Sequence, residues 1–219
     1  MEGIAMTPDT LRSCIGCSSA LADTWAEPLT AAMAAWRIDT PRRQSAFLAT
    51  IGVESQRLMR GRENMFYTTA ERLLKVFGTR IRADEVEKFL RNPVALGNRV
   101  YANRPGSGNG DELSGDGYRF RAGGPLGLTS RANYAAFEAA SGYPVTTNPS
   151  LIEQPDVGAA SAGWFWETNG CNTIIDEDDF AGTQGMVNAG RRRTPPSRIN
   201  GFDERLALWK TCKNVLGVP

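Results

Sequence analysis

The chain contains no histidine among its 219 residues. This absence excludes serine–histidine and cysteine–histidine nucleophile pairs, and it excludes zinc sites of the HExxH type. Carboxylates are left as the natural groups for acid–base chemistry. The chain also lacks any apolar run approaching the roughly 18 residues that a transmembrane helix needs, so stable membrane insertion is not expected.

An excess of charge of one sign is also missing. Lys and Arg number 25 and Asp and Glu number 24, so no global field attracts the chain to nucleic acid or anionic lipid. The N-terminal region shows no basic segment followed by an apolar run, which argues against a secretory signal. No repeat, linker or low-complexity tract appears. We therefore expect a single domain over residues 1–219 that is made in, and soluble in, the cytoplasm.

Cysteines are few and irregularly spaced, at positions 14, 17, 171 and 212. The pair Cys14 and Cys17 forms a CxxC, which is compatible with redox chemistry or with half of a zinc site. No second CxxC follows, however, and the pair lies in a helical pattern. Buried free thiols in a reducing compartment are therefore predicted, and neither a metal nor another cofactor is expected.

Helical signals cover most of the chain and predict a mainly α fold. They mark residues 7–38 (two helices, the second around 28–36), 69–77, 84–90, 129–141, 155–167, 176–186 and 203–216. The stretch 97–127 is glycine-rich and irregular. Such a stretch is either a linker or a functional wall. Its tyrosines and arginines favour an ordered wall along a sugar-binding groove, with at most a minor β-hairpin.

The segment 47–67 carries the chemistry. Phe47, Leu48 and Ile51 recur at helical spacing with Leu58 and predict one buried face. Glu54 lies at or near this face, and Gly61 is predicted to end the helix as its C-cap. Glu63 then follows on non-helical chain.

The predicted break decides how the two glutamates can be related. Residues nine apart on a continuous helix point about 180° away from each other, but a break at Gly61 lets Glu63 turn back toward Glu54. Two carboxylates in unlike surroundings are what glycoside hydrolysis requires. On spacing alone, a core helix with a surface glutamate at each end remains an open alternative.

Longer strings carry a family resemblance. FLATIGVES and ENMFYTTAERLLKVF resemble the family 19 glycoside hydrolases, especially their bacterial and phage branch, including the nine steps between the two glutamates. NRVYANRPGSGNGDELSGDGYRFRAGGPLGLTSRANY, NPSLIEQPDVGAASAGWFW and MVNAG resemble further strings of that family, in the same order. The resemblance covers nearly the whole chain and implies a lysozyme-like, family 19 chitinase-like helical domain.

The resemblance also implies roles for individual residues. Glu54 matches the general acid, Glu63 the general base, and Thr129 the hydroxyl that helps hold the attacking water. The family inverts the anomeric configuration by direct displacement, which needs room for a water between the carboxyls. The residues expected to bind substrate are Tyr67, Tyr118, Arg119, Arg121, Asn133, Asn188 and Arg205, with Arg205 matching an arginine of the last helix that supports the base.

Three residues depart from the family pattern: Val53 stands for a His, Gly123 for an Arg and Gly127 for a Gln. The last two remove polar groups from the wall that would face the sugar. Both carboxylates are nevertheless retained.

Family substrates are β-1,4-linked N-acetylhexosamine polymers, namely chitin and peptidoglycan. The chain looks like a phage endolysin, a monomer that hydrolyses peptidoglycan and waits in the bacterial cytoplasm until a holin opens the membrane. A chitinase and a catalytically silent glycan-binding module are the alternatives. The basic loop 190–198 is expected to be a solvated loop or to touch an anionic wall polymer.

Overall fold

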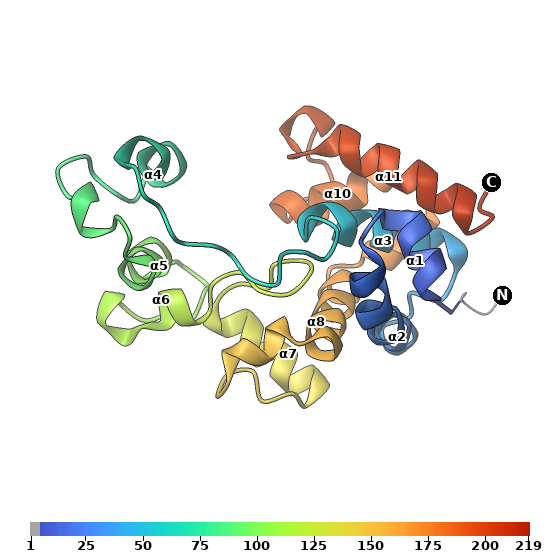
Figure 1. Ribbon diagram of the computed structural model, residues 1–219, viewed down its shortest axis with the longest axis horizontal. Coiled ribbons are helices and arrows are strands. Elements are labelled where there is room, and N and C mark those ends of the chain that lie inside the picture. The colour runs from blue at the N-terminus through green and yellow to red at the C-terminus, as the bar shows by residue number, and fades with distance from the viewer. Residues whose placement is uncertain (1–4) are drawn as a thin grey trace. The chain divides into compact units, whose positions relative to one another are not determined.

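The computed structural model describes residues 5–219, which form helices joined by loops (Figure 1). These residues divide into two compact units. Unit 1 comprises residues up to Gly61, the short segment Gly124–Gly127, and Ile152–Pro219; unit 2 comprises Arg62–Gly123 and Leu128–Leu151. The prediction of a single domain over residues 1–219 stays a prediction. Both units are assembled from separated segments, so no linker-like composition marks their boundaries.

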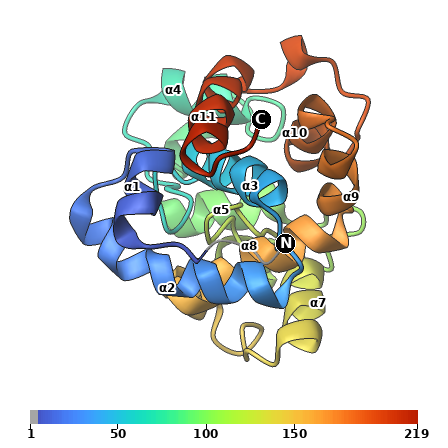
Figure 2. The same ribbon diagram turned by 90° about the vertical axis from the view of Figure 1, so that its right-hand side faces the viewer.

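Unit 1 is a helical bundle. Its α-helices are α1 (Pro8–Ile15), α2 (Ser19–Ala35), α3 (Pro41–Glu54), α8 (Pro155–Thr168), α9 (Cys171–Asp176), α10 (Phe180–Ala189) and α11 (Phe202–Val215). Packing joins the two ends of the chain: α2 lies against α8, and α11 lies against both α1 and α3 (Figure 2).

Helix α3 forms the centre of this bundle. Thr40 caps its start by accepting a hydrogen bond from the Arg43 backbone N–H, and Pro41 follows at the first helical position. All residues from Gln44 to Gly52 are buried. Gly52 lets α11 approach closely, because a Cβ there would lie 2.7 Å from a methyl group of Leu208. Burial on all sides fixes the position of Glu54, the last residue of the helix.

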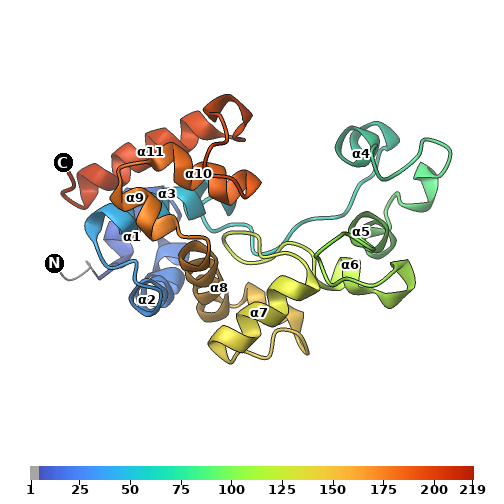
Figure 3. The same ribbon diagram turned by 180° about the vertical axis from the view of Figure 1, so that it is seen from behind.

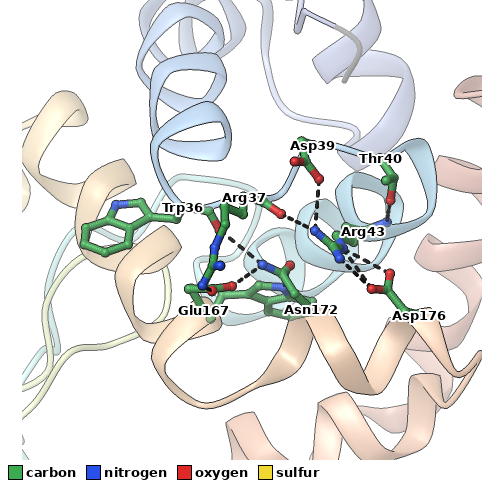
Figure 4. Close-up of polar contacts among 9 residues, drawn as sticks. Trp36, Arg37, Asp39, Thr40, Arg43, Glu167, Asn172 and Asp176 are labelled. Atoms are coloured by element: carbon green, nitrogen blue, oxygen red, sulfur yellow. Dashed lines mark hydrogen bonds and ion pairs between the residues drawn. The ribbon is translucent and has the colours of Figure 1, made fainter. Parts of the chain in front are cut away.

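A polar junction fixes the other end of α3 (Figure 4). The Arg43 guanidinium donates to Asp39 at 2.9 Å and to Asp176 of α9 at 2.5 Å. Asn172 donates to the Trp36 carbonyl at 3.1 Å and also to Glu167 of α8. The junction therefore ties the C-terminal ends of α2 and α8 to α9 and to the first turn of α3.

The end of α3 differs from the sequence prediction. The helix stops at Glu54, with Ser55 as its C-cap, seven residues before Gly61. Gln56, Arg57 and Leu58 then take φ values of 52°, 59° and 68° in succession. Three consecutive non-glycine residues in the left-handed region are strained, at roughly 1–2 kcal/mol each. The Ser55 hydroxyl accepts the Leu58 N–H at 2.8 Å, and Leu58 is buried, so core packing offsets this strain.

Unit 2 has shorter helices and more irregular chain. It contains α4 (Ala70–Phe77), α5 (Pro93–Tyr101), α6 (Asp116–Arg119) and α7 (Arg131–Ser141), with 3₁₀ turns at Val86–Lys88 and Glu112–Ser114. Helices α5 and α6 pack together, as Figure 3 shows. A separate apolar cluster, built around Leu73, Phe89, Leu96 and Val100, gives unit 2 its own core.

The remaining turns complete the chain. A 3₁₀ turn at Pro149–Glu153 precedes α8, and another at Pro196–Arg198 precedes α11. Within residues 5–219 there is no extended strand, only the isolated bridges Arg62–Gly123 and Gly123–Leu128. The prediction of a mainly α fold is confirmed, and in place of the possible hairpin the described residues contain these two bridges.

Several boundaries were predicted wrongly. The second helix begins at Ser19, not near Pro28, because the apolar face formed by Trp25, Ala26 and Leu29 carries the helix through the proline. The predicted irregular stretch 97–127 includes the end of α5 and all of α6. The prediction of buried free thiols is confirmed for all four cysteines. No helix in the described part of the chain is long and apolar enough to cross a membrane.

Candidate active site

Unit 1 presents Glu54 at the C-terminal end of α3. Its side chain is 29% exposed, and its Oε1 accepts a hydrogen bond from Arg205 Nη2 of α11 at 2.5 Å. Arg205 itself is only 2% exposed. Within unit 1 the partner of Arg205 is therefore the predicted acid Glu54, and the expected roles of Arg205 in binding substrate and supporting the base stay predictions.

A buried polar network holds Arg205 in place. Its Nε donates to the Asn200 carbonyl at 3.0 Å, and its Nη1 donates to Gln184 Oε1 at 3.1 Å. The amide of Gln184 in turn donates to the Thr50 hydroxyl at 2.9 Å. Both Gln184 and Thr50 are fully buried. The guanidinium is thus fixed by α3, by α10 and by the chain just before α11.

The network leaves one carboxylate oxygen of Glu54 available. Oε1 receives Arg205, whereas no hydrogen bond from residues 5–219 reaches Oε2. A proton on this carboxyl would therefore be carried on Oε2. Asn188, another predicted residue of unit 1, lies near the end of α10, where its Oδ1 faces the Asn200 N–H at 3.4 Å.

In unit 2, Glu63 also accepts a hydrogen bond on one of its two carboxylate oxygens. Its backbone N–H donates to the Ala122 carbonyl at 2.9 Å, next to the bridge between Arg62 and Gly123. Its Oε2 accepts the phenolic O–H of Tyr101 at 2.8 Å. Within the described residues, no hydrogen bond reaches Oε1. Oε1 is therefore the oxygen that can accept a proton.

Tyr101 is a functional candidate that sequence reasoning missed. It is the last residue of α5 and is 9% exposed, and the Arg104 guanidinium lies 4.3 Å from its ring centre. The only sequence signal was its aromatic character within the predicted wall. Its contact with Glu63 spans 38 residues and depends on the packing of unit 2.

Arg121 connects Tyr118, another predicted residue, to Glu63. Its guanidinium stacks on the Tyr118 ring at 3.9 Å, its Nη1 donates to the Tyr118 carbonyl at 2.9 Å, and its Nε donates to the Glu63 carbonyl at 3.2 Å. Arg119, by contrast, donates to the carbonyls of Thr146 and Thr147. Arg119 therefore braces a loop of unit 2.

Three further predicted residues lie elsewhere in unit 2. Thr129 follows the bridge residue Leu128, and its carbonyl accepts the side-chain amide of Asn133 at 2.8 Å. These two residues are thus brought together at the start of α7. Tyr67 packs edge-on against the Phe77 ring, with centres 5.6 Å apart, so the ring is partly buried against the core of unit 2.

Comparison with known proteins identifies the family. A Haemophilus influenzae protein described as a glycosyl hydrolase family 19 domain-containing protein is 32% identical to the chain over 171 residues, which is 77% of each sequence. The chain belongs to glycosyl hydrolase family 19. A scan against protein-family models gave no match.

Solved structures agree on the fold of this family 19 chain. The chain matches a chitinase C mutant with a TM-score of 0.68 at 18% identity, over 99% of this chain and 95% of that one. It matches chitinase C from Streptomyces griseus with a TM-score of 0.61 at 18% identity, over 98% and 94%. A bacterial family 19 chitinase gives 0.65 at 17% identity, over 99% and 97%.

The departures from the family pattern have local structural settings. Gly127 has a φ of +64° and donates its N–H to the Gly124 carbonyl, so a side chain there would be strained. Gly123 is buried and bridges both Arg62 and Leu128. Val53 is half-buried and faces Gly201.

No metal site accompanies the carboxylates in the described residues, where no group of three or more His, Cys, Asp or Glu side chains could hold an ion.

Proposed function

We propose that this family 19 hydrolase cleaves β-1,4 glycosidic bonds of bacterial peptidoglycan by an inverting acid–base displacement. The observation that carries the proposal is the one-sided anchoring of both glutamates. Arg205 holds one oxygen of Glu54, and Tyr101 holds one oxygen of Glu63. Each carboxyl group keeps its second oxygen for proton transfer.

The proposed reaction is one step. Glu54 delivers a proton from Oε2 to the glycosidic oxygen as the bond from that oxygen to the anomeric carbon breaks. Glu63 takes a proton on Oε1 from a water whose oxygen bonds to the same carbon from the opposite face. Thr129 is proposed to help hold this water. Tyr118, Arg121, Asn133 and Asn188 are proposed to contact the sugars, with no cofactor required.

The proposed biological setting is lysis of a bacterial cell wall. In this setting the protein is a monomeric endolysin that accumulates in the host cytoplasm and reaches the wall once a holin opens the membrane. Hydrolysis of chitin is the second candidate, because the solved structures that the chain resembles are chitinases.

The test is digestion of purified peptidoglycan and of chitin oligosaccharides, with new reducing ends identified by mass spectrometry. Release from peptidoglycan supports the proposal, and release from chitin alone favours the second candidate. Binding to sacculi without new reducing ends from either substrate would show a silent glycan-binding module and would refute the proposed reaction.

Substitutions then test the two carboxylates. Glu54→Gln and Glu63→Gln should each lower turnover by about a hundred- to ten-thousand-fold while the fold is kept, because an amide can neither donate nor accept the required proton. Glu204→Gln and Glu71→Gln alter exposed glutamates in units 1 and 2 and serve as controls. Near-wild-type turnover by folded Glu54→Gln would contradict the assignment.

A further inference from the structure

The loop between α10 and α11 is held in a defined conformation. Gly190 ends α10 with a φ of +65°, and the Thr194 hydroxyl donates to the Arg191 carbonyl at 2.7 Å. Arg192 anchors the loop by donating to Asp179 at 2.7 Å and to Glu177 at 2.6 Å. The conformation of the loop therefore does not depend on the arginines on either side of Arg192.

Arg191 and Arg193, which flank Arg192, line a pocket together with Arg198. Its volume is about 440 Å³, and it is lined by Ala189, Arg191, Arg193, Thr194, Pro195 and Arg198. The lining contains three guanidinium groups and no carboxylate. Glu177 and Asp179, the carboxylates that contact this loop, are paired with Arg192.

The three lining arginines are unpaired within residues 5–219, where no hydrogen bond or ion pair involves the side chains of Arg191, Arg193 or Arg198. Bringing three like charges to one hollow is unfavourable unless an anion joins them. Planar guanidinium groups are suited to carboxylate and phosphate oxygens, which they bind through paired hydrogen bonds. The composition of the pocket therefore fits an external oxyanion.

We propose that this pocket binds the carboxylates of the peptide side chains that peptidoglycan strands carry. The proposal rests on the proposed function and specifies its substrate. Asn188, which the family resemblance assigns to glycan binding, directly precedes the lining residue Ala189. Chitin is neutral and offers nothing to three arginines, whereas peptide-bearing glycan does. The loop thus selects for the wall polymer.

The experiment compares binding of two soluble probes. One is a peptidoglycan fragment that keeps its peptides, and the other is the same glycan after an amidase has removed them. The variant Arg191→Gln, Arg193→Gln, Arg198→Gln should bind the first probe about tenfold more weakly than wild type, at roughly two- to threefold for each exposed ion pair. Its binding of the second probe should be unchanged.

Two further variants separate charge effects from pocket effects. Arg12→Gln, Lys210→Gln, Lys213→Gln removes the same charge from α1 and α11 and should bind both probes like wild type. The triple Arg→Lys variant at 191, 193 and 198 should recover part of the lost affinity. Wild-type binding of the peptide-bearing probe should also weaken as salt rises. Circular dichroism confirms that each variant is folded.

Equal affinity of the pocket variant and wild type for the peptide-bearing probe would overturn the proposal. So would arginine-dependent binding of a phosphodiester wall polymer combined with no arginine-dependent binding of peptide-bearing glycan. All binding measurements, including those called wild type, are made in the Glu54→Gln background, which does not cleave the probes, so the readout is independent of turnover. Absence of new reducing ends with wild-type protein would refute the proposed reaction alone.

Discussion

Replacement of Arg205 by Met tests whether the buried network stabilises unit 1. The change removes hydrogen bonds to Asn200, Gln184 and Glu54 from a residue that is 2% exposed. Gln184 Oε1 keeps only a 3.3 Å contact from the Thr50 hydroxyl. Breaking a buried ion pair typically costs about 3–5 kcal/mol. Because Glu54 is 29% exposed and can regain water, we expect the lower end, about 3 kcal/mol.

The measurement is the free energy of unfolding from urea titrations, with circular dichroism as the signal. Arg42→Met is the matched control, because its ion pair with Asp178 is exposed and should contribute at most about 1 kcal/mol. A loss below about 1 kcal/mol for Arg205→Met would refute the reasoning.

The double variant Arg205→Met, Glu54→Gln measures the interaction energy between these two side chains. Glu54→Gln alone leaves Arg205 buried without its anion, so the two single losses should sum to more than the loss of the double variant. Strict additivity would show that the two side chains do not interact energetically.

Three other predictions concern Glu63, unit 2 packing and the thiols. Tyr101→Phe removes the donor to Glu63 and should lower kcat about tenfold or more, with KM little changed, in reducing-end assays; an unchanged kcat would remove Tyr101 from the site. Gly117→Ala should destabilise the protein by about 1–3 kcal/mol in urea titrations, because its Cβ would lie 2.5 Å from the Gly97 carbonyl oxygen; no loss would contradict this packing. Burial raises the pKa of Cys171 from 9.0 to about 12. The thiol of the unfolded chain therefore loses its proton at lower pH than the thiol of the folded chain. The free energy of unfolding should fall as pH rises from about 9 toward 12, and the loss should be about 3 kcal/mol at pH 11. Thermal melts of Cys171→Ala should show a weaker pH dependence, and an identical one would refute the assignment.

The sequence predicted helices well where a long apolar periodicity coincided with a capping residue. Helix α3 has both, with Thr40 at its start and Phe47 and Ile51 on its buried face. Its end was missed because Gln56 and Arg57 have no intrinsic preference for the left-handed region. Only the tertiary structure, which buries Leu58, holds them there.

Individual residues of the candidate site could be predicted from the sequence, but the contacts between them could not. Both glutamates were identified from their spacing and the family strings, and their roles remain predictions. The partners of the glutamates were not identified, because Arg205 lies 151 residues from Glu54 and Tyr101 lies 38 residues from Glu63. Such distant pairings leave no periodic signal in a single sequence. The contact between Arg205 and Glu54 was therefore not predicted.

The interrupted path of the chain through unit 1 has a consequence for biosynthesis. Helices α1, α2 and α3 emerge from the ribosome first, but they pack against α8 and α11, which are made last. All residues of unit 2 have been made once Leu151 is added, and only the segment Gly124–Gly127, which belongs to unit 1, interrupts them. Nascent chains stalled beyond this point should therefore contain a protease-resistant unit 2 while α1–α3 are still cleaved, and early protection of α1–α3 would contradict this order. The helix that carries Glu54 is thus synthesised early and acquires its Arg205 partner only when the final helix leaves the ribosome.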